Sequence, residues 1–565
     1  MPTVKTERVD DIPLLLEQLK KMNVAEIFED TFEFHGNWQG LSPGKVTVVW
    51  LSHILSQADH RMNQVEEWSE KRITTLEKCV NEKVRSLDFT DDRLSIILQK
   101  LSNDTGWSKF EQSLNKHLLR VYDFSGQAIR VDSTTASGYW TTTEDGIFQL
   151  GYSKDKRPDL PQVKVNISAL DPLGMPLVTQ IVPGNTADDP LYIPAIKEIK
   201  QSFTSSGLFY IGDCKMSAIK TRAFIDEKRD FYLCPLSALQ FSQENLDKYL
   251  QSLEEKDLVD VHRTYSNGET KLIAKGFEKE QSITSHQDQE HSWRERRFIV
   301  RSEELCKAET EAFNRRLLAA QNTLAEITSR KRGKKVLKSK EEVALKVEEI
   351  LKKNNVQELF TYSISETIKT RTKRAYLDRP SEKIEEKQFS LSFSIDDDAL
   401  DKAKKRLGWR IYATNHTSDS LSLKEAVLAY RNEYIIERDF SRLKGYPLSL
   451  SPTYLTRQDH VIGLIRLLSI ILKLVCLLEF NVRSKLKEQQ QEIAGLYAGN
   501  PKRSTPRPTT ELLLRAFKDI YFSIVELPQQ TIVHITPLSE LQRYILLLLG
   551  FPDSVYERLS GNSSN

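Results

Sequence analysis

The sequence predicts an α/β protein with an all-α N-terminal region, a mixed sheet with helices, a large β-rich insertion with a helical hairpin, and a helical C-terminus. Apolar residues recur with helical spacing up to about residue 120 and again from Leu423 onward. Short runs with strand-like alternation begin at about residue 124. The 565 residues are too many for one core, so several structural units are expected. The predicted regions are 1–120, 121–240, 241–415, 416–490 and 491–565.

Composition limits the possible classes of protein. The chain is 28% charged and 39% hydrophobic, as in ordinary globular proteins, and its net charge is only +2. Any nucleic-acid surface must therefore come from local clusters of basic residues. The five cysteines show no CxxC spacing, which favours free thiols in a reducing compartment and argues against structural zinc. The most apolar stretch, Val461–Phe480, contains Arg466, Lys473 and Glu479, so we expect a buried helix there and no membrane partner.

The first two regions contain helices followed by alternating strands and helices. Helical spacing predicts helices at Ile12–Met22, Pro43–Asp59, Met62–Glu70 and Asp92–Ser102. An antiparallel meander follows, with strands at Gln127–Ser133, Gln162–Leu170 and Met175–Val182 and a turn before the last of them. Helices at Asp188–Gln201 and Met216–Asp226 then alternate with strands at Leu208–Gly212 and Asp230–Pro235.

The insertion, 241–415, is polar and strand-prone up to about residue 300. Glu303–Ile327 and Ser339–Lys353 then predict a helical hairpin. Its basic connection, Ser329–Lys335, is interpreted either as a solvated turn or as a finger that contacts phosphates. Further strands are expected at Phe389–Ile395 and Arg410–Thr414, and only helices after Leu423.

The segment Tyr430–Lys444, YRNEYIIERDFSRLK, predicts a single helix with three distinct faces. At about 100° per residue, Ile436, Phe440 and Leu443 form an apolar stripe that would face a core. A basic stripe holds Arg431, Arg438 and Arg442, and a third stripe holds Tyr430, Glu433, Glu437, Ser441 and Lys444. Such a helix suits a metal ion together with a polyanion.

Three acidic residues stand out by their positions. Asp132 and Asp213 each end a predicted strand, and Glu437 lies on the helix just described. Carboxylates at strand ends project into the crevice at the edge of an α/β sheet. If the three converge there, they can hold two Mg²⁺ ions, which prefer oxygen ligands and take further ligands from phosphates. Two such metals activate the nucleophile and stabilise the leaving oxygen in phosphoryl transfer.

Around these residues the chain resembles the IS4-superfamily DDE transposases, most closely the IS1634 group. VDSTTASGYW (131–140) and IGDCKMS (211–217) are similar to the first- and second-aspartate motifs, and 151–189 is similar to the block after the first. Tyr430, Glu437 and Lys444 match the spacing of the Y-(2)-R-(3)-E-(6)-K signature. With 41–68 and 88–94, the resemblance extends over most of residues 10–480.

The resemblance implies an RNase H-like catalytic core, with Asp132, Asp213 and Glu437 as the DDE triad and the ligands of two Mg²⁺ or Mn²⁺ ions. Because the last two acids are 437 − 213 = 224 residues apart, much of 241–415 would be an insertion. The resemblance also implies a cytoplasmic, nucleoid-associated prokaryotic enzyme that acts as a homodimer on double-stranded transposon ends and target DNA. The N-terminal region would bind those ends or support dimerisation.

One position departs from the signature, because Glu433 replaces its arginine and a carboxylate repels phosphate. We therefore predict phosphate contacts from Tyr430 and Lys444, with Arg431 or Arg438 as a partial replacement for the arginine. Lys154 and Arg157 are interpreted either as part of a solvated loop or as DNA contacts. Trp140 and Trp409 are core residues or platforms for a displaced base.

The predicted function is metal-dependent DNA cleavage and strand transfer by an insertion-sequence transposase. Two alternatives stay open. In the first alternative, the chain is an RNase H-like nuclease that cuts DNA without strand transfer. In the second, it is a decayed copy that only binds DNA. The presence of all three acids argues against decay.

Overall fold

The computed structural model describes residues 3–124, 128–203, 205–251, 253–254, 257–265, 268–286, 290–328, 337, 339–373 and 382–561. It divides into two compact units, which are described separately. Unit 1 comprises Met1–Cys234, Thr284–Trp293 and Ala429–Asn565, and unit 2 comprises Pro235–Ile283 and Arg294–Leu428. The basic connection Ser329–Lys335, interpreted above as a turn or a finger, lies outside the described residues.

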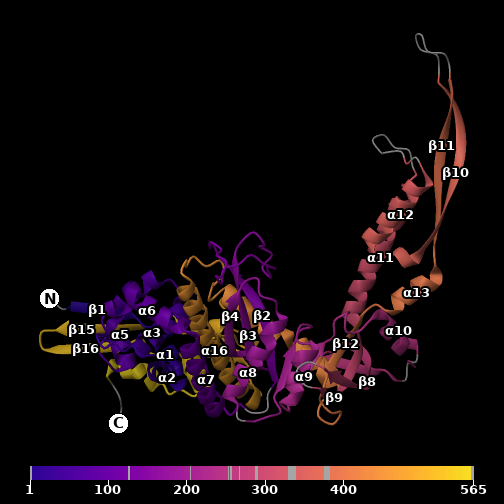
Figure 1. Ribbon diagram of the computed structural model, residues 1–565. Helices are drawn as coiled ribbons and strands as arrows, with labels where there is room; N and C mark the ends of the chain where they lie inside the picture. Colours follow the sequence, from indigo (N-terminus) through magenta and orange to yellow (C-terminus); the bar gives the residue numbers. More distant parts are fainter. Residues whose placement is uncertain are drawn as a thin grey trace, which may run out of the picture. The chain divides into compact units, whose positions relative to one another are not determined.

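Unit 1 begins with a cluster of helices, drawn in indigo in Figure 1. Aromatic rings fill its centre: the ring of Phe28 lies 4.8 Å from that of Phe32 and 5.9 Å from that of Phe110. The helices are α1 (Ile12–Lys21), α2 (Val24–Thr31), α3 (Pro43–Gln57), α4 (Val65–Glu70), α5 (Ile73–Val80), α6 (Asp91–Ser102) and α7 (Asp104–Val121). A strand, β1 (Thr3–Arg8), precedes them, so the prediction of an all-α N-terminal region is wrong at its first residues.

A mixed sheet in the order β4-β3-β2-β5-β6 follows. Its strands are β2 (Ala128–Ser137), β3 (Gln162–Leu170), β4 (Met175–Pro183), β5 (Phe209–Gly212) and β6 (Phe231–Pro235). The first three pair antiparallel, which confirms the predicted meander. β5 and β6 run parallel to β2 because each follows a helical crossover, α8 (Tyr192–Ser202) and α9 (Ile219–Glu227). β3 is buried along its whole length, so both faces of the sheet are covered there.

The 31-residue helix α16 (Gln458–Glu488) connects the helical cluster and the sheet within unit 1. It packs against α6, β4 and α18 (Glu540–Leu549). By length and composition it could cross a membrane, but 94% of its most apolar window is buried inside the fold. Its charged residues have internal partners: Lys473 Nζ donates a hydrogen bond to Asn115 Oδ1 at 2.9 Å. The structure thus confirms the predicted buried helix.

The C-terminal region departs from the prediction of helices only. β15 (Tyr521–Leu527) pairs antiparallel with β16 (Gln530–Ile535) and with β1, and β13 (Ile493–Ala494) pairs with β14 (Ser504–Thr505). The sequence YFSIVEL is rich in β-branched and aromatic residues, whose packing on a pleated surface favours strand. Helices α17 (Thr510–Arg515), α18 and α19 (Ser554–Glu557) complete the region.

Unit 2 contains a sheet in the order β12-β9-β8-β7. The strands are β7 (Val259–Thr264), β8 (Thr270–Ser285), β9 (His291–Ser302, whose first residues belong to unit 1) and β12 (Trp409–Thr414). With α10 (Gln243–Gln251), this sheet encloses a small apolar core around Phe277 and Ile299. The strands expected before residue 300 and at Arg410–Thr414 are therefore confirmed.

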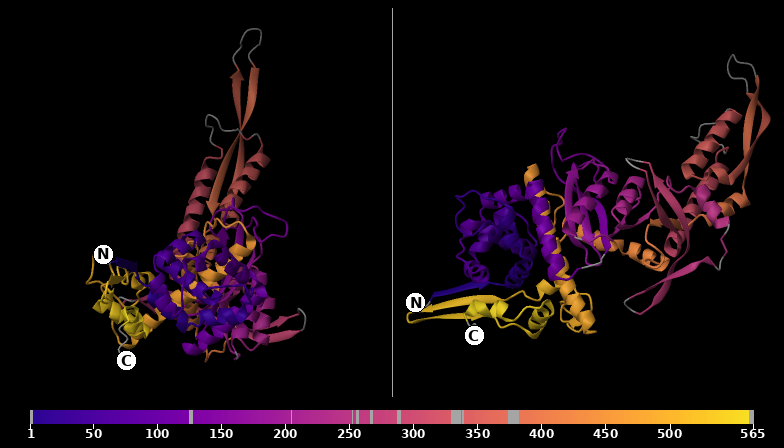
Figure 2. Two further views of the ribbon diagram at one scale, coloured as in Figure 1. Left: turned by 90° about the vertical axis from the view of Figure 1, so that its left-hand side faces the viewer. Right: turned by 60° about the horizontal axis from the view of Figure 1, so that its bottom comes forward.

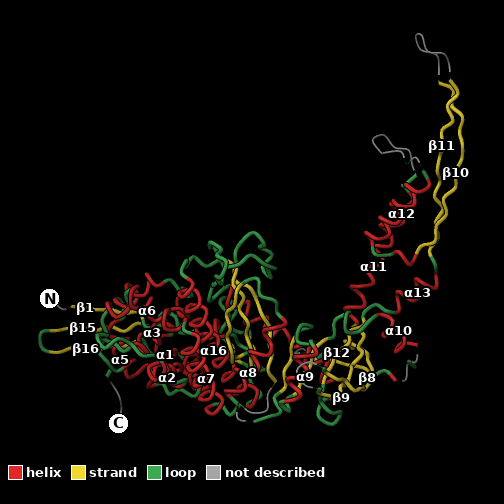
Figure 3. The backbone as a smooth tube through the Cα atoms, in the orientation of Figure 1, coloured by secondary structure: helices red, strands yellow, loops and turns green. Residues whose placement is uncertain are grey.

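A helical hairpin and a long β-hairpin lie alongside each other in unit 2 (Figures 1, 2 and 3). Helices α11 (Glu303–Ala325) and α12 (Lys340–Asn354) share a core with strands β10 (Phe360–Lys373) and β11 (Glu382–Ile395). Ser339 caps α12, because its hydroxyl accepts a hydrogen bond from the backbone N–H of Glu342 at 3.1 Å. After α13 (Asp397–Lys405) and β12, the chain returns to unit 1 within α14 (Leu423–Tyr430).

Candidate active site

Asp132 and Asp213 lie next to each other where two parallel strands of unit 1 separate. β2 and β5 pair in register up to Val131 and Gly212, and the two aspartates are the next residues. Neighbouring strands are about 4.8 Å apart, and side chains in equal register point to the same face. The carboxylates therefore share one face of the sheet. The prediction that Asp132 ends its strand is wrong, because β2 continues to Ser137 along its antiparallel partner β3.

The carboxylate of Asp213 is held by two donors. The hydroxyl of Tyr192 donates to Asp213 Oδ1 at 2.6 Å, and the backbone N–H of Lys215 donates to the same oxygen at 2.8 Å. A Cβ on Gly212 would lie 2.8 Å from Met216 Sδ and 3.0 Å from Tyr192 Cε1, so only glycine permits this close packing. Burial raises the pKa of Tyr192 far above its usual value, which keeps its hydroxyl a donor. Sequence reasoning missed Tyr192, since only the fold brings α8 to β5.

Asp132 lies beside a lysine. Its Oδ1 accepts the backbone N–H of Ser133 at 2.7 Å and lies 3.4 Å from Lys154 Nζ. Burial raises the pKa of Asp132, the charge of Asp213 adds to that rise, and Lys154 opposes it. Lys154 Nζ also donates to the carbonyl of Ser133. The loop that follows β2 thus folds back and brings a cation to the first aspartate.

The segment Tyr430–Lys444 is two helices and not the single helix predicted. α14 ends at Tyr430, Asn432 has non-helical dihedral angles (φ −83°, ψ 17°), and α15 (Tyr434–Lys444) follows. Within α15, Ile436, Phe440 and Leu443 are buried, so the predicted apolar stripe does face a core. The bend changes the angular positions of Tyr430 and Glu433 relative to the residues of α15.

A small pocket forms where this bend meets the two strands. Its lining includes Asp132, Asp213, Tyr430 and Glu433. Burial raises the pKa of Glu433, and the charges of Asp132, Glu437 and Asp213 raise it further. Glu437, predicted as the third acid of the triad, does not line this pocket; it is exposed one helical turn beyond Glu433. Glu433 thus lines the same pocket as Asp132 and Asp213, a position that the sequence did not suggest, and Glu437 lies outside it.

The basic residues predicted to contact DNA lie in different environments. Lys444 Nζ pairs with Asp155 Oδ1 at 2.5 Å, and the exposed Arg157 pairs with Asp159 at 2.7 Å. Arg438, by contrast, is drawn into the fold: it donates to the carbonyl of Leu173 at 3.1 Å and lies 3.5 Å from the buried carboxylate of Glu479. The prediction that Arg438 replaces the signature arginine is therefore not supported. Arg431 is partly buried next to the pocket residue Tyr430.

The side chains of Asp132, Asp213, Glu433 and Glu437 suit a divalent cation by their chemistry. Their donors are oxygens only, which suits Mg²⁺ or Mn²⁺. Among the residues that the structure describes, no group of three or more His, Cys, Asp or Glu side chains is arranged closely enough to hold a metal ion. Asp132 instead has an ammonium beside it. Burial is the main cause of the raised pKa values of Asp132 and Glu433, and neighbouring negative charges add to it; a bound cation would oppose both effects.

Neither tryptophan considered as a base platform is freely exposed. Trp140 is 9% exposed, stacks on Phe148 with ring centroids 4.2 Å apart, and donates from Nε1 to the carbonyl of Leu455 at 2.6 Å. Trp409 packs edge-on against Phe277 in the core of unit 2. Both serve packing, which was one of the two interpretations given above.

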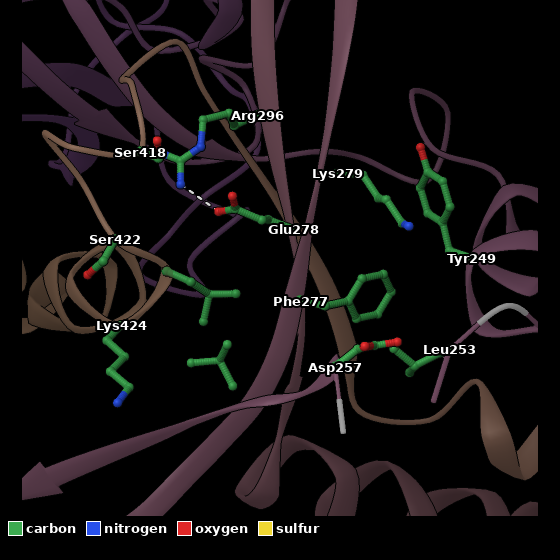
Figure 4. Close-up of a pocket in the computed structure, with 12 residues that line it drawn as sticks. Tyr249, Leu253, Asp257, Phe277, Glu278, Lys279, Arg296, Ser418, Ser422 and Lys424 are labelled. Atoms are coloured by element: carbon green, nitrogen blue, oxygen red, sulfur yellow. Dashed lines mark hydrogen bonds and ion pairs between the residues drawn. The ribbon is translucent and has the colours of Figure 1, made fainter. Parts of the chain in front are cut away.

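A larger pocket lies within unit 2, between β8 and the start of α14 (Figure 4). Arg296, which lines this pocket, donates hydrogen bonds to the carboxylate of Glu278 at 2.5 Å and to the carbonyl of Leu421 at 2.8 Å. The lining of this larger pocket includes two acids, Asp257 and Glu278, whereas the small pocket of unit 1 is lined by Asp132, Asp213 and Glu433.

A family model described as "Transposase DDE domain" matches residues 118–474. The match covers more than half of the chain, and the chain belongs to this family of transposases. The matched range contains both aspartates, the α14–α15 bend and all of unit 2. Family membership makes the chain an enzyme of the nuclease and transferase type, from a family that uses divalent metal ions.

The other comparisons add little. No curated protein matches the chain. Among solved structures, a cryo-EM structure of the piggyBac transposase synaptic complex with hairpin DNA is similar over 98% of this chain and 82% of that chain. The sequence identity is 8% and the TM-score is 0.32.

Proposed function

We propose that this protein is an insertion-sequence transposase of the IS4 superfamily, IS1634-like, that cleaves DNA at transposon ends and transfers the freed 3′-hydroxyl to target DNA. The observation that carries the proposal is the β2–β5 register, which puts Asp132 and Asp213 side by side in a chain of the DDE transposase family. The sheet supports an RNase H-like core, since three antiparallel strands are followed by two parallel ones.

Each acidic residue has a role in this proposal. Asp132, Asp213 and, from α15, Glu437 are the residues that would hold the divalent ions. Bound Mg²⁺ or Mn²⁺ would polarise the scissile phosphate and lower the pKa of the attacking water or hydroxyl. The Tyr192 hydroxyl and the Lys215 N–H both donate to Oδ1 of Asp213, which holds this carboxylate in place. Glu433 adds negative charge beside them.

The proposed partner is double-stranded DNA, both transposon ends and target, bound by a homodimer. Tyr430 lines the pocket of the aspartates, and Lys154 lies beside Asp132. Lys444, on the helix that carries Glu437, reaches Asp155 in the loop after β2. A DNA phosphate could replace either carboxylate as the partner of these lysines, so they are suited to position a strand at the acids.

The experiment uses the full-length protein, Mg²⁺ and a DNA fragment that carries the sequences flanking its gene. We expect nicks at the element ends and covalently joined products with a target plasmid, separated on denaturing gels. Nicks without joined products would identify a nuclease that lacks strand transfer. Binding without nicks in Mg²⁺ or Mn²⁺ would indicate a copy that only binds DNA.

The variant Asp213→Ala tests the metal assignment. We expect it to lose both products while its DNA binding is retained, because the carboxylate would hold a cation and not the DNA. Glu526→Ala, which removes an exposed acid of β15, is the matched control and should retain both products. Activity of Asp213→Ala equal to that of the unmodified protein would refute the assignment.

A further inference from the structure

Two exposed tyrosines form a stacked pair on the surface of unit 1. Tyr139 is 59% exposed and Tyr454 is 78% exposed, yet their ring centroids lie 6.0 Å apart with an interplanar angle of 21°. Single exposed aromatic residues are common on proteins. Two rings held parallel in solvent, from chain segments more than 300 residues apart, form a defined flat apolar surface.

The backbone on both sides of this pair is anchored. Gly138 forms a parallel bridge with Thr453, and the backbone N–H of Thr453 donates to the carbonyl of Ser137 at 3.3 Å. Next to them, the buried Trp140 donates its indole N–H to the carbonyl of Leu455 at 2.6 Å. The tyrosines therefore sit on fixed backbone, and a ligand that stacks on them need not order it first.

The pair lies on the segments that also form the active site. Tyr139 lies two residues after the end of β2, the strand of Asp132, and the same loop returns to bring Lys154 within 3.4 Å of Asp132. Two further exposed tyrosines, Tyr152 and Tyr446, are 88% and 72% exposed. Tyr152 lies three residues before Asp155 in the sequence, and Tyr446 lies two residues after Lys444, its partner in an ion pair. In Figure 1 the loop after β2 and the loop before α16 project at the same end of the sheet.

We propose that Tyr139 and Tyr454, with Tyr152 and Tyr446, form a stacking surface for unpaired bases of single-stranded DNA next to the cut strand. We call these four residues the tyrosine surface. This inference rests on the proposed function, because DNA must enter the carboxylate site for its unpaired end to pass over the loops. Base–aromatic stacking tolerates any sequence, since every base has a π-face.

The chemistry of the loop favours DNA over a protein partner. The residues YSKDKRPD (152–159) combine one exposed tyrosine with Lys154, Lys156 and Arg157. Cations close to an aromatic ring suit a strand that presents both phosphates and bases. The centres of protein interfaces are instead depleted of charged residues. The mixture of acids and bases also means that stacking, and not net positive charge, must supply much of the binding.

The test compares two DNA ligands without catalysis. The full-length protein in EDTA is titrated with a blunt duplex and with the same duplex carrying an unpaired extension that contains 2-aminopurine. We expect tighter binding of the extended DNA and quenching of the 2-aminopurine by stacking. The double variant Tyr139→Ala/Tyr454→Ala should lose about tenfold or more in affinity for the extended DNA and lose the quenching, with blunt-duplex affinity unchanged.

Two further variants serve as controls. Tyr139→Phe/Tyr454→Phe keeps both rings and should bind like the unmodified protein, and Tyr521→Ala removes an exposed tyrosine of β15 and should have no effect. Equal losses on both DNAs, or unchanged quenching in the alanine variant, would overturn the proposal. So would an alanine variant that alters self-association in sedimentation but not DNA binding. The titration contains no metal ion, so a negative result in it does not depend on whether the protein cleaves DNA. The two proposals can therefore fail separately. If the double variant melts early, Tyr454→Ala alone gives the same comparison.

Discussion

At the scale of single residues, the feature that sets this site apart is Glu433. It stands where the family signature has arginine, and it lies close enough to Asp132 and Asp213 for their charges to raise its pKa. The bend at Asn432 turns it into the pocket of the two aspartates, while Glu437 stays exposed on α15. A carboxylate there repels phosphate, so in the proposed function Glu433 would act through the cations assigned to the acids and not through DNA.

The two glutamates can be separated by substitution. We expect Glu437→Gln to reduce cleavage at least about 100-fold, as loss of a metal ligand, and Glu433→Gln to reduce it about tenfold, as loss of an outer charge. The measurement is the single-turnover cleavage rate, together with Mn²⁺ affinity by electron paramagnetic resonance. The reverse order of effects would make Glu433 the third acid of the triad.

Lys154 gives a second prediction at this scale. Lys154→Met removes the ammonium beside Asp132, so the salt dependence of DNA binding should decrease by about one unit of log K against log salt. Lys485→Met, which removes an exposed lysine paired with Glu488, should leave that slope unchanged. An unchanged slope in Lys154→Met would show that this lysine neutralises Asp132 only.

Sequence reasoning predicted that the two aspartates follow short apolar runs, although β2 continues past Asp132, and it missed contacts made across the fold. Asp132 and Asp213 were predicted from two short apolar runs. Tyr192, which hydrogen-bonds Asp213, has no local signal. Arg438 was assigned to DNA from its face of the helix, and its partner Glu479 lies 479 − 438 = 41 residues later, on a different helix. The spacing of residues along a helix shows which side chains share a face. It does not show which other element packs against that face.

At the scale of elements, the turn between β3 and β4 contacts the helix of the site. Gly174 has φ +81°, and a Cβ there would lie 2.7 Å from Asp439 Oδ2 and 3.1 Å from Ile435 Cγ2. Asp439 and Ile435 belong to the buried face of α15. The turn residue therefore sets how closely α15, and with it Glu437, approaches the sheet.

Gly174→Ala tests this contact. The left-handed conformation and the steric clash together should lower the free energy of unfolding by more than about 1 kcal/mol, and cleavage should fall because α15 moves. Gly36→Ala is the matched control, since nothing lies within 4 Å of a Cβ at that position. Chemical unfolding followed by circular dichroism gives the comparison. Equal stability of both variants would contradict the predicted clash.

Periodicity identified most elements correctly, and its errors have physical causes. The helical hairpin, the meander and α16 each have long, regular patterns. Residues 521–535 were expected to be helical, although β-branched and aromatic residues favour strand there; the pairing with β1 lies far away in sequence. The bend at Asn432 was not predicted because the segment contains no glycine or proline, although asparagine is a weak helix former.

At the scale of the whole molecule, burial of a charge links stability to pH. Asp11 is 5% exposed, and burial raises its pKa from 3.8 to about 6, although the hydroxyl of Ser56 donates to it at 2.6 Å. The folded state thus binds this proton more tightly than the unfolded chain. Its stabilising effect is complete below about pH 4 and is lost as the pH rises through about 6.

Asp11→Asn should therefore raise the melting temperature at pH 7 but not at pH 4. A shift of about 2 pKa units corresponds to at most about 3 kcal/mol at neutral pH. Thermal melts of both proteins at the two pH values provide the measurement. An equal difference between the proteins at pH 4 and pH 7 would show that Asp11 does not titrate in this range.

The pairing of β1 with β15 joins residues 3–8 to residues 521–526. During synthesis on the ribosome, the first strand emerges long before its neighbour exists, and at about 5–20 residues per second the interval is tens of seconds or more. Throughout that time β1 presents an unpaired edge to the cell, as an isolated strand open to other chains. The pairing that completes this part of the fold therefore forms late. Until then, a chaperone or another copy of the chain can bind β1 before β15 does.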